Sequence, residues 1–404
     1  VLNGEDHILN KIKLAQANKM KIDGHASGLN AAQILGYRAA GIETDHECIT
    51  AHEAMNRIEQ GMYVLIREGS AAKNLKALIP AINAANARRF AFCTDDKHLD
   101  ELIEEGSINH SVAMAIEEGL APLQAIQIAT LNAAECYQLK NKGALTAGYI
   151  ADIVLVEDVT KMKISAVFKN GQLVAEGGVM CEAPANTTEL KHSIVHSVQI
   201  PTIEKSQLAI PFKYGNVANV IEIMPDQITT KKKVAHVDVQ NGVFIPCIEK
   251  DYLKLAVVER HHHLGNIGVA IVHGCGLKEG AVATTIAHDS HNAIVVGTND
   301  DDMIKALEAL QEMQGGLVIV RNGEVMASLS LPIAGLMTNE PADMVVPKLE
   351  EIHEAIHKIH PTLSYHFFLT LSFLSLPVIP ELKLTDTGLF DVVQFKHIDT
   401  EVSV

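Results

Sequence analysis

The chain has 404 residues and a formal net charge of −16, with 33 Lys and Arg against 49 Asp and Glu. This length suits two or three domains, and 48% hydrophobic residues are enough to fill their cores. The acidic balance, without a block of Lys and Arg, excludes an electrostatic nucleic-acid binder. No apolar run reaches the roughly 18 residues of a membrane span, so we expect no membrane partner. Six scattered cysteines without pairing spacings favour a reducing, cytoplasmic location.

Residues 20–140 repeat one pattern, in which a short apolar run ends at a residue able to do chemistry and a helix-like stretch follows. The predicted strands are Met20–Gly24, Gly41–Asp45, Met62–Ile66 and Phe90–Thr94. They are followed by His25, by His46 and Glu47, by Arg67 and Glu68, and by Asp95 and Asp96. Alternation of this kind predicts βα units with parallel strands.

Helices are predicted between these strands, over Leu29–Ala40, Thr50–Gln60, Ser70–Ala85 and Pro122–Leu139. Four such units are half of an eight-unit barrel. Half a barrel would expose apolar strand edges, which natural proteins avoid. We therefore expect residues 1–140 to be the second half of a (β/α)₈ barrel, with the other four strands upstream in a longer chain or on another chain.

From Gly143 onward the sequence pattern changes and predicts short strands and turns. Asn170-Gly171 lies between two apolar runs and predicts a hairpin. We expect a small β-sandwich segment over residues 141–185, with a linker at Pro184–Glu189, and a separate C-terminal α/β domain over 186–404, in which strands and helices alternate again. The elements expected there are strands at Lys233–Val239, Ala256–Glu259, Gly268–Val272, Ala293–Val296 and Gly316–Val320, and a helix over Asp300–Met313.

Three strand ends offer ligands for one metal ion. In a barrel of this type the C-terminal ends of the strands meet at one face, so His25, His46 and Asp95 are expected to converge there. Imidazole suits zinc and iron, and carboxylate suits manganese. A metal held there would lower the pKa of a bound water to about 7. A single one of these histidines would be better explained as a hydrogen-bonded, partly buried imidazole.

The neighbouring polar residues have two interpretations each. Glu47 is expected to move protons, with a pKa raised by burial, or to form a structural ion pair. Of Asp95 and Asp96, one is expected to bind metal and take a proton from water, while Asp96 also suits a helix N-cap. Arg67 and Glu68 would orient substrate or form a strand-end salt bridge, and we favour a role outside the direct ligands.

Histidines also gather in the C-terminal part, at His261–His263 and Ala287–Asn292. The second group, which includes His291, could bind a metal or reach the active site, and a polar loop is the favoured alternative. Gly274, Gly276 and Gly280 lack the Lys-Ser/Thr ending of a phosphate-binding loop. The motifs of base-flipping zinc deaminases and of serine hydrolases do not occur.

Several strings resemble the adenine deaminase family of the amidohydrolase superfamily. They are Ile22-Asp23-Gly24-His25-Ala26, Thr44-Asp45-His46-Glu47, Arg67-Glu68-Gly69-Ser70, Phe92-Cys93-Thr94-Asp95-Asp96, Gly148-Tyr149-Ile150-Ala151-Asp152, His288-Asp289-Ser290-His291-Asn292 and Phe373–Pro380. The match runs nearly from end to end, and the Arg-Glu-Gly-Ser and His-Asp-Ser-His-Asn strings are its most specific parts.

The resemblance implies hydrolysis of adenine to hypoxanthine and ammonia in purine salvage. It implies a divalent metal centre, with manganese expected, iron or zinc as alternatives, and two ions in the centre. His25 and His46 would be metal ligands after the fifth and sixth strands. Asp95 would bind metal and activate water after the eighth strand, and Glu47 would carry a proton to the purine ring. A homo-oligomer is expected.

The sequence departs from the family in one respect. The family has a His-x-His pair on the first strand and a bridging Glu after the fourth, and neither occurs in this sequence. We therefore expect activity to require the N-terminal half of the barrel. The alternatives are another amidohydrolase acting on cyclic amidines or amides, and a non-catalytic fragment that needs its N-terminal half.

Overall fold

The computed structural model describes residues 1–181, 191–225 and 227–402. The chain forms two compact units, Val1–Thr187 and Thr188–Val404, and each is described by itself. The expected linker at Pro184–Glu189 lies outside the described residues.

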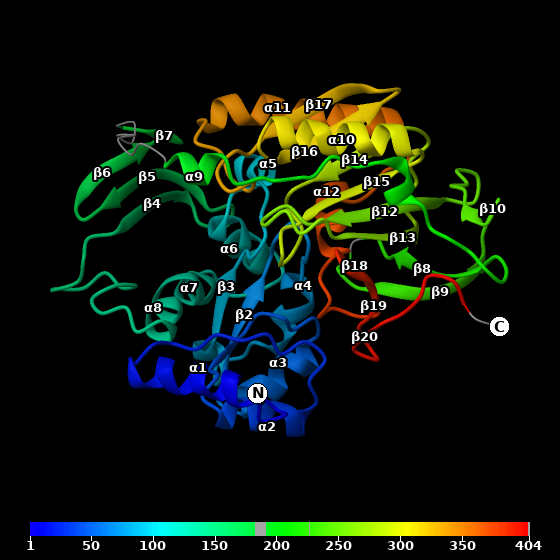
Figure 1. Cartoon of the computed structure of the whole chain (residues 1–404). Helices are drawn as coiled ribbons and strands as arrows, with labels where there is room; N and C mark the ends of the chain where they lie inside the picture. Colours follow the sequence, from blue (N-terminus) through cyan, green and yellow to red (C-terminus); the bar gives the residue numbers. More distant parts are fainter. Residues whose placement is uncertain (182–190, 226, 403–404) are drawn as a thin grey trace. The chain divides into compact units, whose positions relative to one another are not determined.

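A parallel three-stranded sheet is the centre of the first unit (Figure 1). Its order is β1 (Thr44–Asp45), β2 (Tyr63–Arg67) and β3 (Phe90–Cys93). The helices of this unit are α1 (Asp6–Ala17), α2 (Ala31–Ala39), α3 (Ala51–Glu59), α4 (Leu75–Leu78), α5 (Leu99–Glu104), α6 (Ile108–Glu117), α7 (Pro122–Gln127) and α8 (Ala133–Cys136). Shorter 3₁₀ segments at Ile79–Ala81 and Ala87–Arg89 and a π-helical segment at Ile128–Asn132 complete it.

Side-chain alternation along β2 separates the core from the site. Val64 and Ile66 are buried among the residues of α3, α4 and α6. Leu65 points the other way, against Ala91. Because successive side chains of a strand point to opposite faces, Arg67 lies on the same side as Leu65, at the end of the strand.

The predicted βα elements of this unit are confirmed in part. Thr50 caps α3, its side chain accepting from the Glu53 N–H while the Glu53 carboxylate accepts from the Thr50 N–H. The strand predicted at Met20–Gly24 is wrong, because among the described residues the only backbone hydrogen bond that joins this extended segment to its neighbour runs from Glu43 N–H to Ile22 C=O (3.1 Å).

The long helix predicted over Ser70–Ala85 is also wrong. The Glu68 carboxylate accepts from Leu75 N–H (3.0 Å), so the helix starts only at Leu75. Pro80 has no N–H to continue it, and a short 3₁₀ segment ends at Ala81.

A four-stranded antiparallel sheet follows, in the order β4 (Ile153–Asp158), β5 (Lys163–Lys169), β6 (Gln172–Glu176) and β7 (Val179–Met180). The hairpin predicted at Asn170-Gly171 is confirmed. Both residues have positive φ, 50° and 79°, as a two-residue turn of this type requires.

The second unit is built on an eight-stranded sheet in the order β17-β16-β14-β15-β12-β13-β8-β9. Its strands are β8 (Val217–Ile223), β9 (Thr230–His236), β12 (Tyr252–Val258), β13 (Ile267–His273), β14 (Ala281–Thr284), β15 (Ala293–Gly297), β16 (Gly316–Arg321) and β17 (Glu324–Ser330). All neighbouring pairs are antiparallel except β13 with β8.

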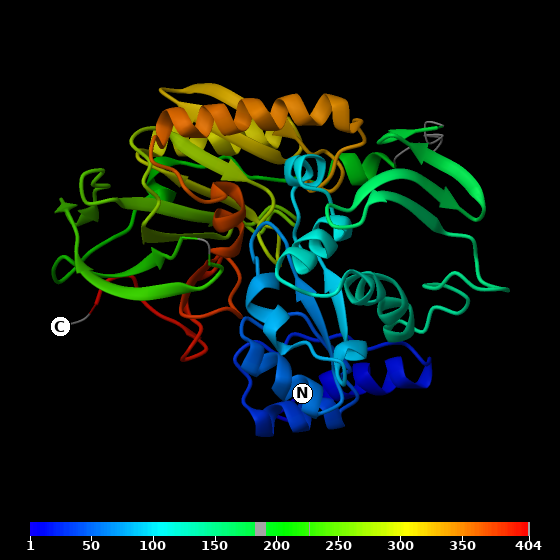
Figure 2. The same ribbon diagram turned by 180° about the vertical axis from the view of Figure 1, so that it is seen from behind.

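The helix α10 (Asp300–Glu312) packs against β14, β15 and β16, and α11 (Ala342–Ile359) packs against β16 and β17 (Figure 2). Every residue of β15 is buried, so this part of the sheet is covered on both faces. The unit also contains α9 (His192–Val195), a 3₁₀ segment at Lys205–Leu208, α12 (Phe367–Phe373), the pair β10 (Val239–Gln240) and β11 (Val243–Phe244), and the sheet of β18 (Leu382–Thr385), β19 (Gly388–Asp391) and β20 (Lys396–His397).

The second unit mixes helices and strands as expected, but their expected alternation is wrong for much of it. Among the described residues no helix lies between β8 and β15, and the strands there pair mainly with antiparallel neighbours. Short apolar runs look alike in parallel and antiparallel sheets when both faces are covered.

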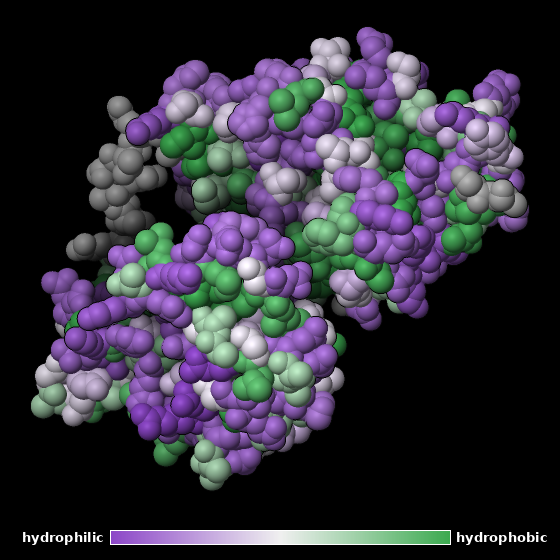
Figure 3. Space-filling view, turned by 60° about the horizontal axis from the view of Figure 1, so that its bottom comes forward, coloured by the Kyte–Doolittle hydropathy of each residue, from purple (hydrophilic) through white to green (hydrophobic). Residues whose placement is uncertain are grey.

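Hydrophilic residues dominate the visible surface, with hydrophobic ones scattered among them (Figure 3). None of the helices in the described part of the chain is long and apolar enough to cross a membrane.

Candidate metal centre

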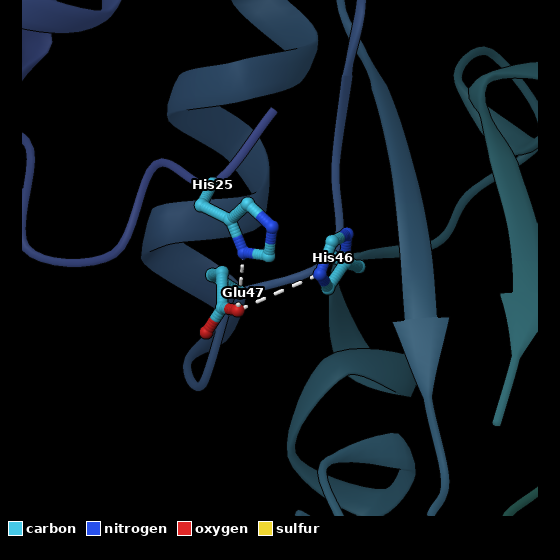
Figure 4. Close-up of side chains that lie close together, drawn as sticks. All are labelled: His25, His46 and Glu47. Carbon is cyan, nitrogen blue, oxygen red and sulfur yellow. Dashed lines mark hydrogen bonds and ion pairs between the residues drawn. The ribbon is translucent and has the colours of Figure 1, made fainter. Parts of the chain in front are cut away.

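Two imidazoles and one carboxylate converge in the first unit (Figure 4). His25 follows the extended segment that ends at Gly24, and His46 and Glu47 follow β1. The His25 Nδ1 atom lies 3.0 Å from Glu47 Oε1, and the His46 Nε2 atom lies 3.5 Å from the same oxygen. The centroids of the two rings are 4.6 Å apart. His46 and Glu47 are largely buried, whereas the His25 side chain is 76% exposed, so the cluster opens to solvent at His25.

Glu47 is ionised in this environment. Burial alone would raise the pKa of its carboxyl group, but the hydrogen bond with His25 and the charges of Arg67 and His46 outweigh burial and lower the pKa to about 2. The predicted net rise in the pKa of Glu47 is therefore wrong, although burial acts in the expected direction. In turn, the hydrogen bond to Glu47 raises the pKa of His25.

Arg67 links two of the carboxylates that were predicted as site residues. Its Nη1 atom donates to Glu47 Oε1 (3.3 Å) and to Asp95 Oδ2 (3.0 Å). Arg67 and Glu47 are largely buried, so water screens their bond little, whereas the Asp95 side chain is 42% exposed. We favoured an indirect role for Arg67. Its position is more central than that, because it contacts Glu47 of the cluster itself.

Asp95 lies beside the cluster without being one of its three members. It follows β3 and has a φ of 55°, a left-handed conformation that Asp tolerates better than most residues. Its carboxylate contacts Arg67, and the metal role predicted for it stays a prediction.

The loop that carries Asp95 lies directly against the loop that follows Arg67. The Ser70 N–H donates to Asp96 C=O (2.7 Å). A Cβ atom at Gly69 would overlap the Thr94 carbonyl oxygen and lie 2.8 Å from that of Asp96, so only glycine permits this approach.

The other predicted site residues have different surroundings. Glu68 is buried and turned toward the start of α4, where it caps Leu75, and burial raises its pKa. Asp96 contributes its backbone carbonyl to the loop contact with Ser70. His291 belongs to the second unit, where its Nδ1 atom accepts from Ala287 N–H (3.2 Å) and burial lowers its pKa.

Three further polar residues surround the cluster and were missed as site residues. Asp23 Oδ2 lies 3.7 Å from His46 Nδ1. Asp45 and Arg57 form a buried ion pair directly beneath the cluster. Asp23 and Asp45 lie within the recognised motifs, which could have marked them, but Arg57 is an ordinary helix residue in the sequence, and only the fold brings it here.

The donor set fits a divalent transition metal. Among the described residues, His25, His46 and Glu47 form the group of this kind, and one ligand atom from each lies within 4.8 Å of the others. Two imidazoles with a carboxylate suit zinc, iron or manganese. The histidines at 261–263 and 288–291 form no such group in the described part of the chain.

Comparisons with known proteins identify the family of the chain. Residues 2–174 match the model of the Amidohydrolase family, and residues 227–396 match that of the Adenine deaminase C-terminal domain. The chain is 59% identical over 401 residues to an adenine deaminase of Lysinibacillus sphaericus (strain C3-41), covering 99% of this chain and 69% of that protein. It is 51% identical over 395 residues to an adenine deaminase of Geobacillus kaustophilus (strain HTA426), covering 98% and 68%.

A solved β-aspartyl dipeptidase of Fervidobacterium islandicum AW-1 matches 46% of this chain and 56% of its own, at 16% identity and a TM-score of 0.37, too distant to inform the site. The family matches define a metal-dependent hydrolase of the amidohydrolase class, acting on C–N bonds. More particularly, the chain belongs to the adenine deaminase family.

Proposed function

We propose that this chain serves the hydrolysis of adenine to hypoxanthine and ammonia in purine salvage, at the cluster of His25, His46 and Glu47. The observation that carries the proposal is the convergence of these three side chains within 4.8 Å in a member of the adenine deaminase family.

A divalent metal would be held by His25, His46 and Glu47, with manganese expected, iron or zinc as alternatives, and a second ion completing the centre. When bound, the metal lowers the pKa of a water molecule to about 7 and so supplies hydroxide at neutral pH. The low pKa of Glu47 supports a role as an anionic ligand rather than as the proton carrier expected from the sequence.

The proton transfers of the reaction are then assigned to Asp95. Hydroxide adds to C6 of adenine, N1 gains a proton, and the exocyclic amine must be protonated before the C–N bond breaks and ammonia leaves. We assign to the Asp95 carboxylate two successive transfers: it takes the proton of the attacking water and delivers it to N1, and it then takes the proton of the new C6 hydroxyl and delivers it to the amine. The C–N bond breaks as the C6 carbonyl of hypoxanthine forms, and ammonia leaves. Arg67 orients Asp95 through the bond at Oδ2, which leaves the other carboxylate oxygen for this proton.

We also keep the architecture expected from the sequence as part of the proposal. Residues 1–140 would be the second half of a (β/α)₈ barrel that requires four further units, followed by a β-sandwich segment over 141–185 and a C-terminal domain over 186–404. The parallel pairing of β1, β2 and β3 supports the barrel, because parallel sheets of this kind are covered on both faces.

A cytoplasmic homo-oligomer completes the proposal. The six cysteines are all free, which supports a reducing compartment. Exposed apolar side chains, among them Leu123, Leu145 and Tyr214, would be candidates for burial in an oligomer.

The test is ammonia release by the full-length protein with added Mn²⁺, using adenine, adenosine and dihydroorotate as substrates. We expect turnover of adenine alone. Turnover of dihydroorotate or adenosine without adenine would replace the proposal with another amidohydrolase activity. Absence of bound transition metal together with absence of turnover would favour a non-catalytic role.

A further inference from the structure

A buried carboxylate joins the two segments that carry the cluster. Asp45, the last residue of β1, is completely buried. Its Oδ1 atom accepts from Ala26 N–H (3.2 Å), directly after His25, and from Glu47 N–H (3.0 Å), directly after His46. One oxygen atom therefore fixes the backbone next to both histidines, although they are far apart in the sequence.

A guanidinium from α3 holds this carboxylate from the other side. Arg57, which is 1% exposed, donates from Nε to Asp45 Oδ2 (2.9 Å). Its Nη2 atom donates to the Ala26 carbonyl (2.6 Å). The N–H and the C=O of Ala26 are thus both held by the same ion pair, which restricts rotation of the peptide units on either side of this residue.

A buried ion pair is weak evidence for stability, because the cost of removing both charges from water offsets much of their attraction. Its value lies in geometry, since planar Arg and carboxylate groups bond in fixed directions. Here the pair makes hydrogen bonds to the backbone of Ala26, next to His25, and to the backbone N–H of Glu47, next to His46.

We infer that Asp45 and Arg57 are positioning residues, which set the distance between His25 and the His46–Glu47 segment and so determine the affinity for the metal. The inference rests on the proposed function in one respect only, that these three side chains bind a metal. Partners of this kind behind metal ligands typically change metal affinity by about 10- to 100-fold when they are lost.

The experiment measures Mn²⁺ affinity of the full-length protein by competition with a chelator, for the wild type and for Asp45→Asn and Arg57→Lys. Asp45→Asn keeps the shape but removes the charge, and Arg57→Lys keeps the charge but removes the forked geometry. Arg260→Lys is the matched control, because Arg260 is equally buried and is held by carbonyl oxygens of the second unit. Circular dichroism identifies the variants that fold.

We expect both test variants to bind Mn²⁺ about 10- to 100-fold more weakly, and the control to bind as the wild type does. With Co²⁺ in place of Mn²⁺, the visible absorption spectrum should change in the test variants, because the ligands no longer hold the same arrangement. For adenine, kcat should fall while KM stays within about threefold, and Asp45→Glu should restore part of the affinity.

Folded variants with wild-type Mn²⁺ affinity and an unchanged Co²⁺ spectrum would overturn the inference, even if their melting temperatures fell, because the pair would then be merely structural. If Asp45→Asn does not fold, the Mn²⁺ affinity and the Co²⁺ spectrum of Arg57→Lys test the inference. Wild-type protein that binds Mn²⁺ without deaminating adenine would refute the proposed function and leave this test intact. A wild type that binds no Mn²⁺ would overturn both.

Discussion

Neighbouring histidines occur in both units, and among the described residues the pair His25 and His46 is the one arranged with a carboxylate as a metal site. In the first unit, His25 and His46 face a common carboxylate oxygen of Glu47. In the second, the ring centroids of His288 and His291 are 5.4 Å apart, the His291 Nδ1 atom accepts a backbone hydrogen bond, and the His288 ring stacks on Phe373.

The difference shows that proximity of imidazoles is not enough. A metal ligand needs a nitrogen that no stronger local bond occupies, and a site gains from an anionic partner. Glu47 supplies that partner to both histidines of the first unit. In the second unit Asp289 Oδ1 lies 3.8 Å from His288 Nδ1, but the described residues there form no group of three ligand atoms.

The largest expected effect separates the two histidine pairs. His25→Ala should abolish adenine turnover and remove most of the bound metal, because it deletes a direct ligand. His291→Ala should leave the metal content of the protein unchanged, since its Nδ1 atom is engaged with Ala287. Metal analysis of the two purified variants checks this, and equal losses in both would refute the contrast drawn here.

A smaller effect is expected for the proton carrier. Asp95→Asn should lower kcat for adenine by about 10²- to 10⁴-fold, the range for a lost general acid or base. Arg67→Lys should lower kcat less, because Lys can pair with Asp95 but cannot hold Glu47 at the same time. Steady-state kinetics give both values, and an Asp95→Asn enzyme with wild-type kcat would reject the assigned role.

In the second unit, Lys383 should make stability depend on pH. It is completely buried on β18, donates to the Ile228 carbonyl (2.8 Å), and burial lowers its pKa to about 7. Between about pH 7 and pH 10 the unfolded chain binds a proton that the folded chain does not. The free energy of unfolding should therefore rise with pH by up to about 1.4 kcal/mol per pH unit in that window.

The matched variant Lys383→Met lacks this proton uptake. Its free energy of unfolding should exceed that of the wild type most at pH 7, and the two should approach each other toward pH 10. Denaturant unfolding at several pH values measures the difference. If the difference in the free energy of unfolding between the two proteins does not change with pH, Lys383 is not neutral in the folded protein at high pH.

The smallest effect compares helix caps in the two units. Thr50→Ala removes the cap of α3, which carries Arg57, and Asn299→Ala removes that of α10. Each should cost about 1 kcal/mol of stability. Only Thr50→Ala should also weaken Mn²⁺ binding, by a few-fold at most, and equal Mn²⁺ affinity in both variants would show that the α3 cap does not influence the ligands.

Sequence patterns predicted local structure well where a local signal exists. Examples are the helix predicted from Thr50 to Gln60, the Asn170-Gly171 hairpin and the apolar runs of β2 and β3. The prediction failed at Ser70–Ala85 because a side chain from outside the segment, Glu68, sets where the helix begins.

The sequence predicted part of the site. His46 and Glu47 follow β1 as periodicity predicts, whereas His25 follows an extended segment where a strand was predicted, and Asp95 lies outside the cluster. The low pKa of Glu47 could not be predicted, because it depends on the hydrogen bond with His25 and on the charge of Arg67, which come from other segments and outweigh burial. The role inferred for Arg57 depends in the same way on a contact between distant segments.

The position of the metal tests the proposed site most directly. Crystals of the full-length protein grown with Mn²⁺ would give an anomalous scattering signal from the ion. We expect a peak at coordination distance, about 2.0–2.3 Å, from nitrogen atoms of both His25 and His46, with the Glu47 carboxylate beside it. Manganese bound elsewhere, with these imidazoles outside its coordination sphere, would contradict the proposed site.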